Sequence, residues 1–161
     1  MIYDVLDAHG IEYQRVDHPP VYTCDDVRRL VPDLPGAETK NLFLRDAKGR
    51  RHFLVTVGPD KRVDLKGLAR ALGLNGLRMA SAERLMEYLG VEAGAVTLLA
   101  LVNDPDGAVE MVFDEELWQA DAFQCHPLVN TSTLILSKEA LTAFFAAVGH
   151  EPAIMDVPSR E

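Results

Sequence analysis

A lysine and an asparagine stand together at the start of an apolar run in this 161-residue chain. Lys40 offers an ammonium group that can meet a phosphate, a carboxylate or an ester carbonyl, and Asn41 can donate and accept hydrogen bonds at once. Successive side chains of a strand face opposite sides, so both reach one ligand only where the strand begins irregularly. Without such an irregular start, the pair is a surface lysine beside a turn asparagine.

Two further segments carry groups suited to a site. Gly94 precedes an apolar run, and a glycine turn lets backbone N–H and C=O groups approach a ligand closely. His126 stands before a proline and is followed by polar residues that include Asn130. Its neighbour Cys125 is poorly placed to act with it as nucleophile and base, because adjacent strand residues point to opposite faces. We expect Cys125 in the core and His126 at the site.

Metal and cofactor chemistry finds no support in the sequence. The five histidines are scattered, and neither a paired histidine motif nor a C-x-x-C motif occurs, so no metal is predicted. The glycine motifs of P-loop, dinucleotide-binding and serine-hydrolase proteins are missing too, and no cofactor is predicted. The remaining lysine, asparagine, glycine turn and histidine suit the binding and polarisation of a small ester or phosphate.

Local signals predict the elements that position these groups. Apolar runs over 41–45 and 52–57, separated by a turn-forming segment, indicate a hairpin. Capping residues and closing glycines predict helices over 2–9, 23–30, 64–72, 81–89 and 137–148. Further strands are expected over 11–18, 96–102, 109–113, 122–125 and 132–136. Because no regular βαβ alternation appears, we expect an α+β domain spanning 1–161, with a curved, barrel-like mixed sheet surrounded by helices.

The charge of the chain is unevenly distributed. The formal net charge is −9, which disfavours indiscriminate nucleic-acid binding and argues against a DNA-binding function. Residues 40–70 hold nine basic and three acidic side chains, a net +6, which leaves −15 for the rest. An acidic body with one basic segment suits contact with a polyanion at a single place. A solvated hairpin and helix with ordinary surface charges explains the same pattern equally well.

The sequence predicts a cytoplasmic protein. No apolar run approaches the roughly 20 residues of a membrane-spanning helix, so no membrane association is expected. The N-terminal residues include an acid where a signal peptide carries base. Two cysteines do not form a disulfide framework, which favours a reducing compartment.

Four ordered blocks of the chain resemble the freestanding prolyl-tRNA editing proteins of the YbaK-like superfamily, which is related to the insertion domain of bacterial prolyl-tRNA synthetase. The likeness covers nearly the whole chain and is strongest over 39–46, 89–97, 100–104 and 126–133. The Lys40-Asn41 pair and the His-Pro-Leu-x-Asn-x-x-Thr run that starts at His126 look like the branch that deacylates alanyl-tRNA(Pro). The cysteinyl-specific branch shares the lysine but not these flanking residues.

The resemblance implies hydrolysis, in trans, of the ester that joins alanine to the terminal adenosine of tRNA(Pro). Its partners would be the acceptor end of the mischarged tRNA and prolyl-tRNA synthetase, whose proline pocket cannot strongly exclude a smaller side chain. A second, smaller pocket would then admit alanine and exclude proline. The resemblance assigns catalytic roles to Lys40, Asn41 and Gly94, and no cofactor. It assigns substrate binding to Thr97, Leu98, His126 and Asn130.

One position departs from the family pattern. The family loop often reads Gly-x-x-x-Pro from the glycine that corresponds to Gly94, and here the fifth position is Leu98. Two alternative functions therefore stay open at this point: a deacylase for cysteinyl- or seryl-tRNA(Pro), and a non-catalytic module of the same fold that binds tRNA, a nucleotide or a synthetase. No residue is an obvious general base, in agreement with the substrate-assisted mechanism that the family implies.

Overall fold

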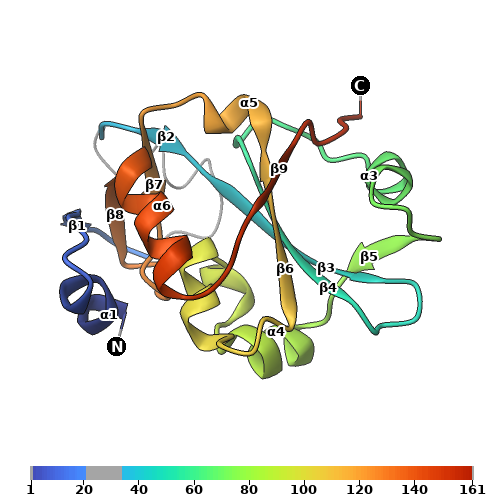
Figure 1. The fold of residues 1–161 in the computed structure, drawn as a ribbon, viewed down its shortest axis with the longest axis horizontal. Helices are drawn as coiled ribbons and strands as arrows, with labels where there is room; N and C mark the ends of the chain where they lie inside the picture. Colours follow the sequence, from blue (N-terminus) through green and yellow to red (C-terminus); the bar gives the residue numbers. More distant parts are fainter. Residues whose placement is uncertain (1, 21–33, 161) are drawn as a thin grey trace.

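The computed structural model describes residues 2–20 and 34–160, and its strands form two separate sheets (Figure 1). The four-stranded sheet has the order β1 (Gln14–Asp17), β8 (Ser132–Ser137), β7 (Ala122–Cys125) and β2 (Ala37–Glu38). The five-stranded sheet has the order β5 (Leu77–Met79), β3 (Lys40–Asp46), β4 (His52–Val57), β6 (Val109–Asp114) and β9 (Ala153–Met155). The predicted α+β class is confirmed.

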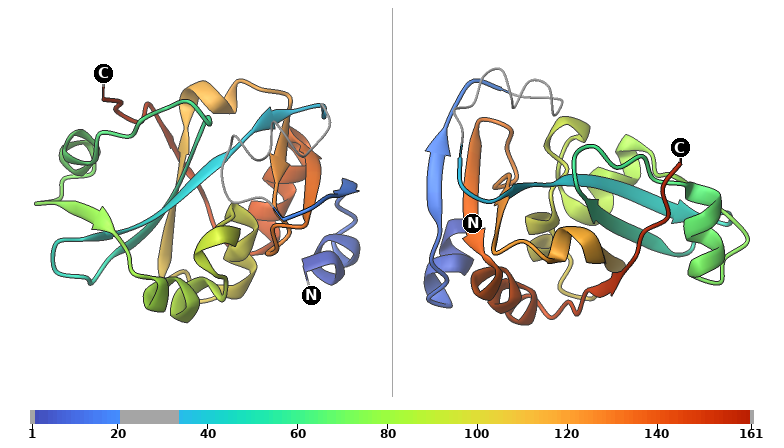
Figure 2. Two further views of the ribbon diagram at one scale, coloured as in Figure 1. Left: turned by 180° about the vertical axis from the view of Figure 1, so that it is seen from behind. Right: turned by 90° about the horizontal axis from the view of Figure 1, so that it is seen from above.

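The predicted barrel-like sheet is wrong in one respect, because the two sheets do not close into one barrel. The chain changes sheet at Thr39, where it leaves the parallel pairing of β2 with β7 and begins the antiparallel pairing of β3 with β4. In Figure 2, β2 and β3 form one run across the molecule. The chain crosses between the two sheets again from β6 to β7 and from β8 to β9.

The hairpin prediction is confirmed in place and register. β3 and β4 pair antiparallel from Lys40 opposite Val57 to Arg45 opposite His52. β7 and β8 form a second antiparallel pair, in which Cys125 lies opposite Leu134. The segment that separates β7 from β8 holds residues 126–131, the block in which His126 and Asn130 were singled out.

The helices are α1 (Ile2–Ala8), α3 (Leu65–Ala71), α4 (Ala82–Leu89), α5 (Glu115–Trp118) and α6 (Lys138–Ala147). Ser81 and Ser137 cap α4 and α6 as predicted, since their hydroxyl oxygens accept backbone N–H groups. Gly90 ends α4 in the left-handed conformation, at φ 67°. The helix predicted over 23–30 lies outside the described residues. Within 2–20 and 34–160, every helix is too short or too polar to span a bilayer.

The strand predicted over 96–102 is wrong. The chain there forms two short 3₁₀ helices, η1 (Ala93–Ala95) and η2 (Leu98–Asn103). Leu98 to Leu101 are all fully buried, and a continuous apolar run gives no periodicity that separates a buried strand from a buried helix. Thr97 Oγ1 accepts the N–H of Leu99 at 3.3 Å and so starts the helical turn.

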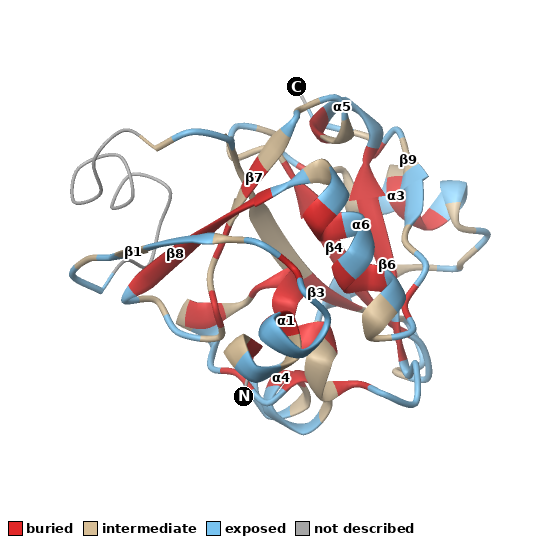
Figure 3. Ribbon diagram, turned by 60° about the vertical axis from the view of Figure 1, so that its left-hand side comes forward, coloured by how far each residue is buried: buried red, intermediate tan, exposed pale blue. Residues whose placement is uncertain are grey.

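Two apolar clusters cover the two faces of the five-stranded sheet, and Figure 3 shows β4 and β8 buried along their lengths. The larger cluster takes Phe43 and Leu54 from this sheet and Phe123 and Leu134 from the other sheet. The smaller cluster takes neighbouring residues of the same strands, such as Leu44, together with residues of α3. The alternation along β3 places its first two side chains toward different clusters.

His52 couples the stability of this fold to pH. The ring is 1% exposed, and Arg84 Nη1 lies 3.0 Å from its Nε2. Because a guanidinium can only donate, Nε2 must accept, and the ring is neutral. Burial, with the Arg84 charge adding to it, lowers the pKa of His52.

We expect the free energy of unfolding to fall as pH drops below about 6.5, where His52 of the unfolded chain takes up its proton before the folded ring does. Urea unfolding at pH 7.5, 6.5 and 5.5 measures this slope in the wild type and in His52→Gln, whose amide oxygen can still accept from Arg84. The variant should have the flatter slope. Equal slopes would remove His52 as a cause of the acid sensitivity.

Candidate active site

Lys40 lies where the chain passes from one sheet to the other. The parallel pairing of β2 with β7 extends to Glu38 opposite Gln124, and Lys40 is the first residue of β3. Thr39, between these two strands, donates its hydroxyl hydrogen to the Gln124 carbonyl at 2.7 Å. Lys40 therefore leaves the four-stranded sheet beside the end of β7, the strand that His126 follows.

The Lys40 and Asn41 side chains face opposite sides of the five-stranded sheet. β3 begins regularly, with Lys40 opposite Val57 and Asn41 opposite Thr56. The Lys40 ammonium donates to the carbonyl of Lys61. On the other face, the buried Thr56 hydroxyl donates to Asn41 Oδ1 at 2.6 Å. The irregular start that would aim both side chains at one ligand does not occur.

A buried ion pair fixes the carbonyl that Lys40 contacts. Lys61 Nζ lies 3.0 Å from both carboxylate oxygens of Asp114, and the two side chains are 12% and 2% exposed. Asp114 Oδ1 also accepts the backbone N–H of Val157 at 3.1 Å. Asp114 thus holds Lys61, and the Lys61 backbone holds Lys40. Sequence reasoning counted Lys61 only as part of the basic segment and gave Asp114 no role.

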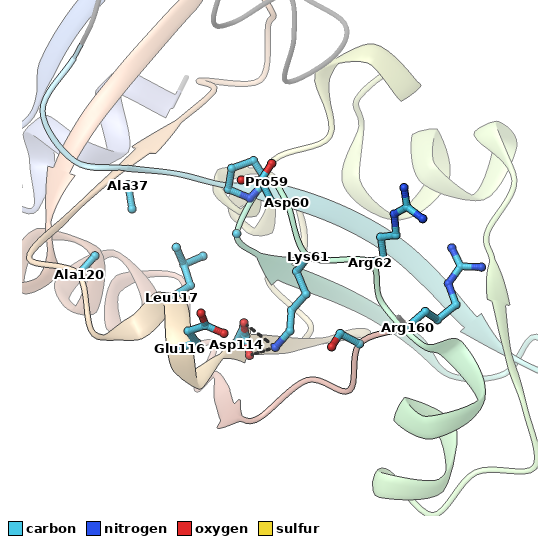
Figure 4. Close-up of a pocket in the computed structure, with 12 residues that line it drawn as sticks. Ala37, Pro59, Asp60, Lys61, Arg62, Asp114, Glu116, Leu117, Ala120 and Arg160 are labelled. Carbon is cyan, nitrogen blue, oxygen red and sulfur yellow. Dashed lines mark hydrogen bonds and ion pairs between the residues drawn. The ribbon is translucent and has the colours of Figure 1, made fainter.

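A pocket of about 670 Å³ opens beside this ion pair (Figure 4). Basic side chains line part of its wall, and apolar side chains from α5 and the segment after β4 line another part. The basic residues of this lining are Lys61, Arg62 and Arg160, and its apolar residues include Pro59 and Leu117. The volume is in the range of small-molecule sites. The signal that could have found this pocket is the Gly58-Pro59 turn directly after β4, followed by two basic residues.

Gly94 and Asn130 line a different pocket together. Its volume is about 370 Å³, and it lies between the α4–η1 connection and the segment that joins β7 to β8. Leu128, which also lines it, is the one non-glycine residue with positive φ among the described residues, at 67°. The structure therefore joins two of the predicted blocks at one cavity.

Thr97 and Leu98 lie in the core and not in the lining of this second pocket. Both side chains are fully buried. Thr97 caps η2, and Leu98 packs within the larger apolar cluster. Both residues support the segment after Gly94 from the core, and neither side chain is exposed to this pocket, so the substrate contacts predicted for them are not formed in this structure.

His126 is half-buried and neutral near pH 7. Its Nδ1–H donates to the carbonyl of Ser132 at 3.2 Å, because a carbonyl can only accept. Burial, followed by the nearby His18 ring, lowers the pKa of His126. The two rings meet edge to face with their centroids 6.4 Å apart. This tautomer leaves Nε2 as an acceptor, which suits recognition of a donor group on a substrate.

Cys125 has the core position predicted for it. The side chain is 1% exposed, and burial raises the pKa of the thiol to about 12. A nucleophilic cysteine must be a thiolate. Cys125 is therefore a packing residue, and the hydrolytic chemistry has to come from other groups.

Comparison with known proteins decides the family. Residues 18–144 match the family model of the aminoacyl-tRNA editing domain. Prolyl-tRNA editing protein ProX of Acetoanaerobium sticklandii is 39% identical over 145 residues, covering 90% of this chain and 88% of that protein. The chain belongs to the aminoacyl-tRNA editing domain family. Prolyl-tRNA synthetase associated domain-containing protein 1 of Danio rerio is 40% identical to this editing domain over 154 residues, covering 94% of this chain and 83% of that protein.

Solved structures confirm the fold of this editing domain. A crystal structure described as a candidate trans-editing enzyme for prolyl-tRNA synthetase superposes with a TM-score of 0.70 at 20% identity, covering 99% of this chain and 95% of that one. The family predicted from the four sequence blocks is confirmed by the family model and by the 39% identical relative.

Proposed function

We propose that this editing domain is a trans-acting deacylase that hydrolyses the ester of alanyl-tRNA(Pro). The observation that carries the proposal is the 39% identity, over nearly the full length of both chains, to a prolyl-tRNA editing protein. Lys40 and His126 add support, because Lys40 follows β2 and His126 follows β7, the two strands that pair in parallel, whereas Asn41 faces the other side of the five-stranded sheet. The specificity for alanine rests on the sequence pattern around Lys40-Asn41 and His126. We further propose that residues 1–161 act as one domain, in the cytoplasm.

In the proposed reaction, a water molecule attacks the ester carbonyl carbon and the bond to the adenosine ribose oxygen breaks. The proton lost by the water goes to that leaving oxygen, with the neighbouring ribose hydroxyl assisting the transfer. The chain supplies neither a thiolate nor an imidazolium for this step, since Cys125 is a buried thiol and His126 is neutral. The family resemblance gives Lys40 the role of stabilising the negative charge that develops, and it gives Gly94, which lines the second pocket, the role of positioning the reacting groups through its backbone.

His126→Ala should weaken substrate binding more than it slows the chemical step. The neutral imidazole offers an acceptor to the substrate but no proton. We expect KM for alanyl-tRNA(Pro) to rise about fivefold to tenfold, which corresponds to the loss of one hydrogen bond, while kcat changes little. A loss of kcat as complete as that of a Lys40 variant would show that His126 has a catalytic role.

Deacylation should weaken as the salt concentration rises, because the basic segment guides the acceptor end toward Lys40. Two charges of this segment are neutralised by ion pairs, because Arg51 is paired with Glu110 and Lys61 with Asp114. We therefore expect kcat/KM to fall severalfold between 50 and 200 mM salt. Alanyl-adenosine, which has no phosphate, is the matched substrate and should show no such decline. A flat response with the full tRNA would contradict electrostatic guidance.

Hydrolysis of a panel of tRNA(Pro) charged with alanine, serine, cysteine or proline tests the function directly. The proposal expects rapid release of alanine and intact prolyl-tRNA(Pro). Preferred release of cysteine or serine would favour the alternative editing specificity. Tight binding of tRNA without hydrolysis of any ester would favour a non-catalytic module.

A further inference from the structure

Arg62 and Arg160 are held side by side at the rim of the 670 Å³ pocket. An antiparallel bridge pairs Val63 with Ser159, and the backbone N–H of Arg160 donates to the carbonyl of Arg62 at 2.7 Å. This register sets the two arginines directly opposite each other, so their side chains leave the bridge on the same side. Figure 4 shows the two guanidinium groups next to one another and pointing the same way.

This arrangement is unfavourable without a ligand. Like charges directly opposite each other across an antiparallel pair repel. Among residues 2–20 and 34–160, no carboxylate forms an ion pair with either guanidinium, although the neighbouring Lys61 is paired with Asp114. An anion shared between the two arginines relieves the repulsion, and a phosphate fits two forked donors well.

The rest of the pocket selects for a ligand with a single anionic end. Pro59 and Leu117 provide an apolar wall, and the carboxylate of Glu116 lies in the remaining lining, where Asp114 is already paired with Lys61. A second phosphate would meet the Glu116 carboxylate. A ligand with one phosphate, hydroxyl groups and a flat apolar ring matches the lining, and the volume accommodates one nucleotide.

We propose that this pocket binds one nucleotide of the unpaired 3′ end of a tRNA. Its phosphodiester lies between Arg62 and Arg160, and its base lies against Pro59 and Leu117. The inference rests on the proposed function, because Lys61 lines this pocket while its carbonyl contacts Lys40. The pocket therefore receives a nucleotide upstream of the aminoacylated adenosine, and it orients the ester toward Lys40.

Binding of uncharged tRNA(Pro), intact or without its three terminal nucleotides, tests this assignment. We expect Arg62→Gln/Arg160→Gln to bind intact tRNA about tenfold more weakly and the shortened tRNA nearly as the wild type does. For intact tRNA, the slope of the logarithm of the binding constant against the logarithm of the salt concentration should become less steep by about 0.7. This is the contribution of one phosphate in a single strand. Arg78→Gln, which changes an exposed arginine of β5 outside both the pocket and the basic segment, is the matched control and should change neither value.

Three results would overturn the assignment. Unchanged binding of intact tRNA by the double variant would show that the pocket does not bind the tRNA. An equal loss for intact and shortened tRNA would place the arginines against the tRNA stem. Competition by inorganic phosphate alone as strong as that by the tetranucleotide ACCA would indicate a small-anion site. Arginine-dependent binding of the 3′ end by a wild type that hydrolyses no ester would instead contradict the deacylase function and support the pocket.

Discussion

Lys40→Ala should lower kcat/KM for alanyl-tRNA(Pro) by at least about a hundredfold while the protein stays folded. The ammonium stands at the junction of the two sheets, where it can stabilise charge that develops on the ester, and loss of one such donor typically costs about two orders of magnitude or more. The backbone of Lys40 keeps its pairing with Val57 in the variant. Single-turnover deacylation measures the loss, and thermal unfolding checks the fold.

Lys48→Ala is the matched control for this variant. Lys48 is an exposed lysine in the turn of the same hairpin, and it belongs to the same basic segment. The control should lose a severalfold part of kcat/KM at most, because it removes one guiding charge but no group that contacts the ester. Equal activity of Lys40→Ala and Lys48→Ala would remove Lys40 from the site.

Asp114→Ala should destabilise the fold by about 3 kcal/mol, because it leaves the Lys61 ammonium buried without its main partner. Among the described residues, the other acid that pairs with Lys61 is Asp156, at 3.6 Å, and its charge is screened by water because the side chain is largely exposed. Val157 also loses the acceptor of its backbone N–H. Thermal unfolding should show a midpoint lower by about 10 °C, and deacylation should fall as well, since the Lys61 carbonyl no longer holds Lys40.

Two further variants separate the ion pair from a general loss of packing. Asp156→Asn should change the midpoint by little, because the side chain is 85% exposed. Asp114→Leu/Lys61→Met removes both charges and should recover most of the stability. A double variant as unstable as Asp114→Ala would show that the loss comes from the shape of Asp114 and from its bond to Val157.

Elements with local signals could be predicted from the sequence. The hydroxyl caps Ser81 and Ser137 and the closing glycine Gly90 fix the ends of two helices within a few residues. The hairpin of β3 and β4 follows from two apolar runs around a turn. The core position of Cys125 follows from the alternation along β7. Each of these features depends on residues close to one another in the chain.

Features that depend on distant residues could not be predicted. The division into two sheets follows from pairings such as that of β2 with β7, which no local pattern records. The apolar run that starts at Leu98 forms a buried 3₁₀ helix, and a continuous apolar run has no periodicity that separates a buried helix from a buried strand. In the site, Lys61 and Asp114 are 53 positions apart, and Arg62 meets Arg160 only through the final residues of the chain. The family resemblance predicted a role for Lys40 but gave no sign of the residues that hold it.

Alanine mischarging by prolyl-tRNA synthetase, followed in the presence and absence of this protein, tests the central claim most directly. The synthetase is supplied with tRNA(Pro) and alanine, or with tRNA(Pro) and proline, and the charged tRNA is measured over time. The account predicts that catalytic amounts of the wild type abolish the accumulation of alanyl-tRNA(Pro), leave prolyl-tRNA(Pro) intact, and lose this effect in Lys40→Ala. Accumulation of alanyl-tRNA(Pro) at the same rate with and without the wild type would contradict it.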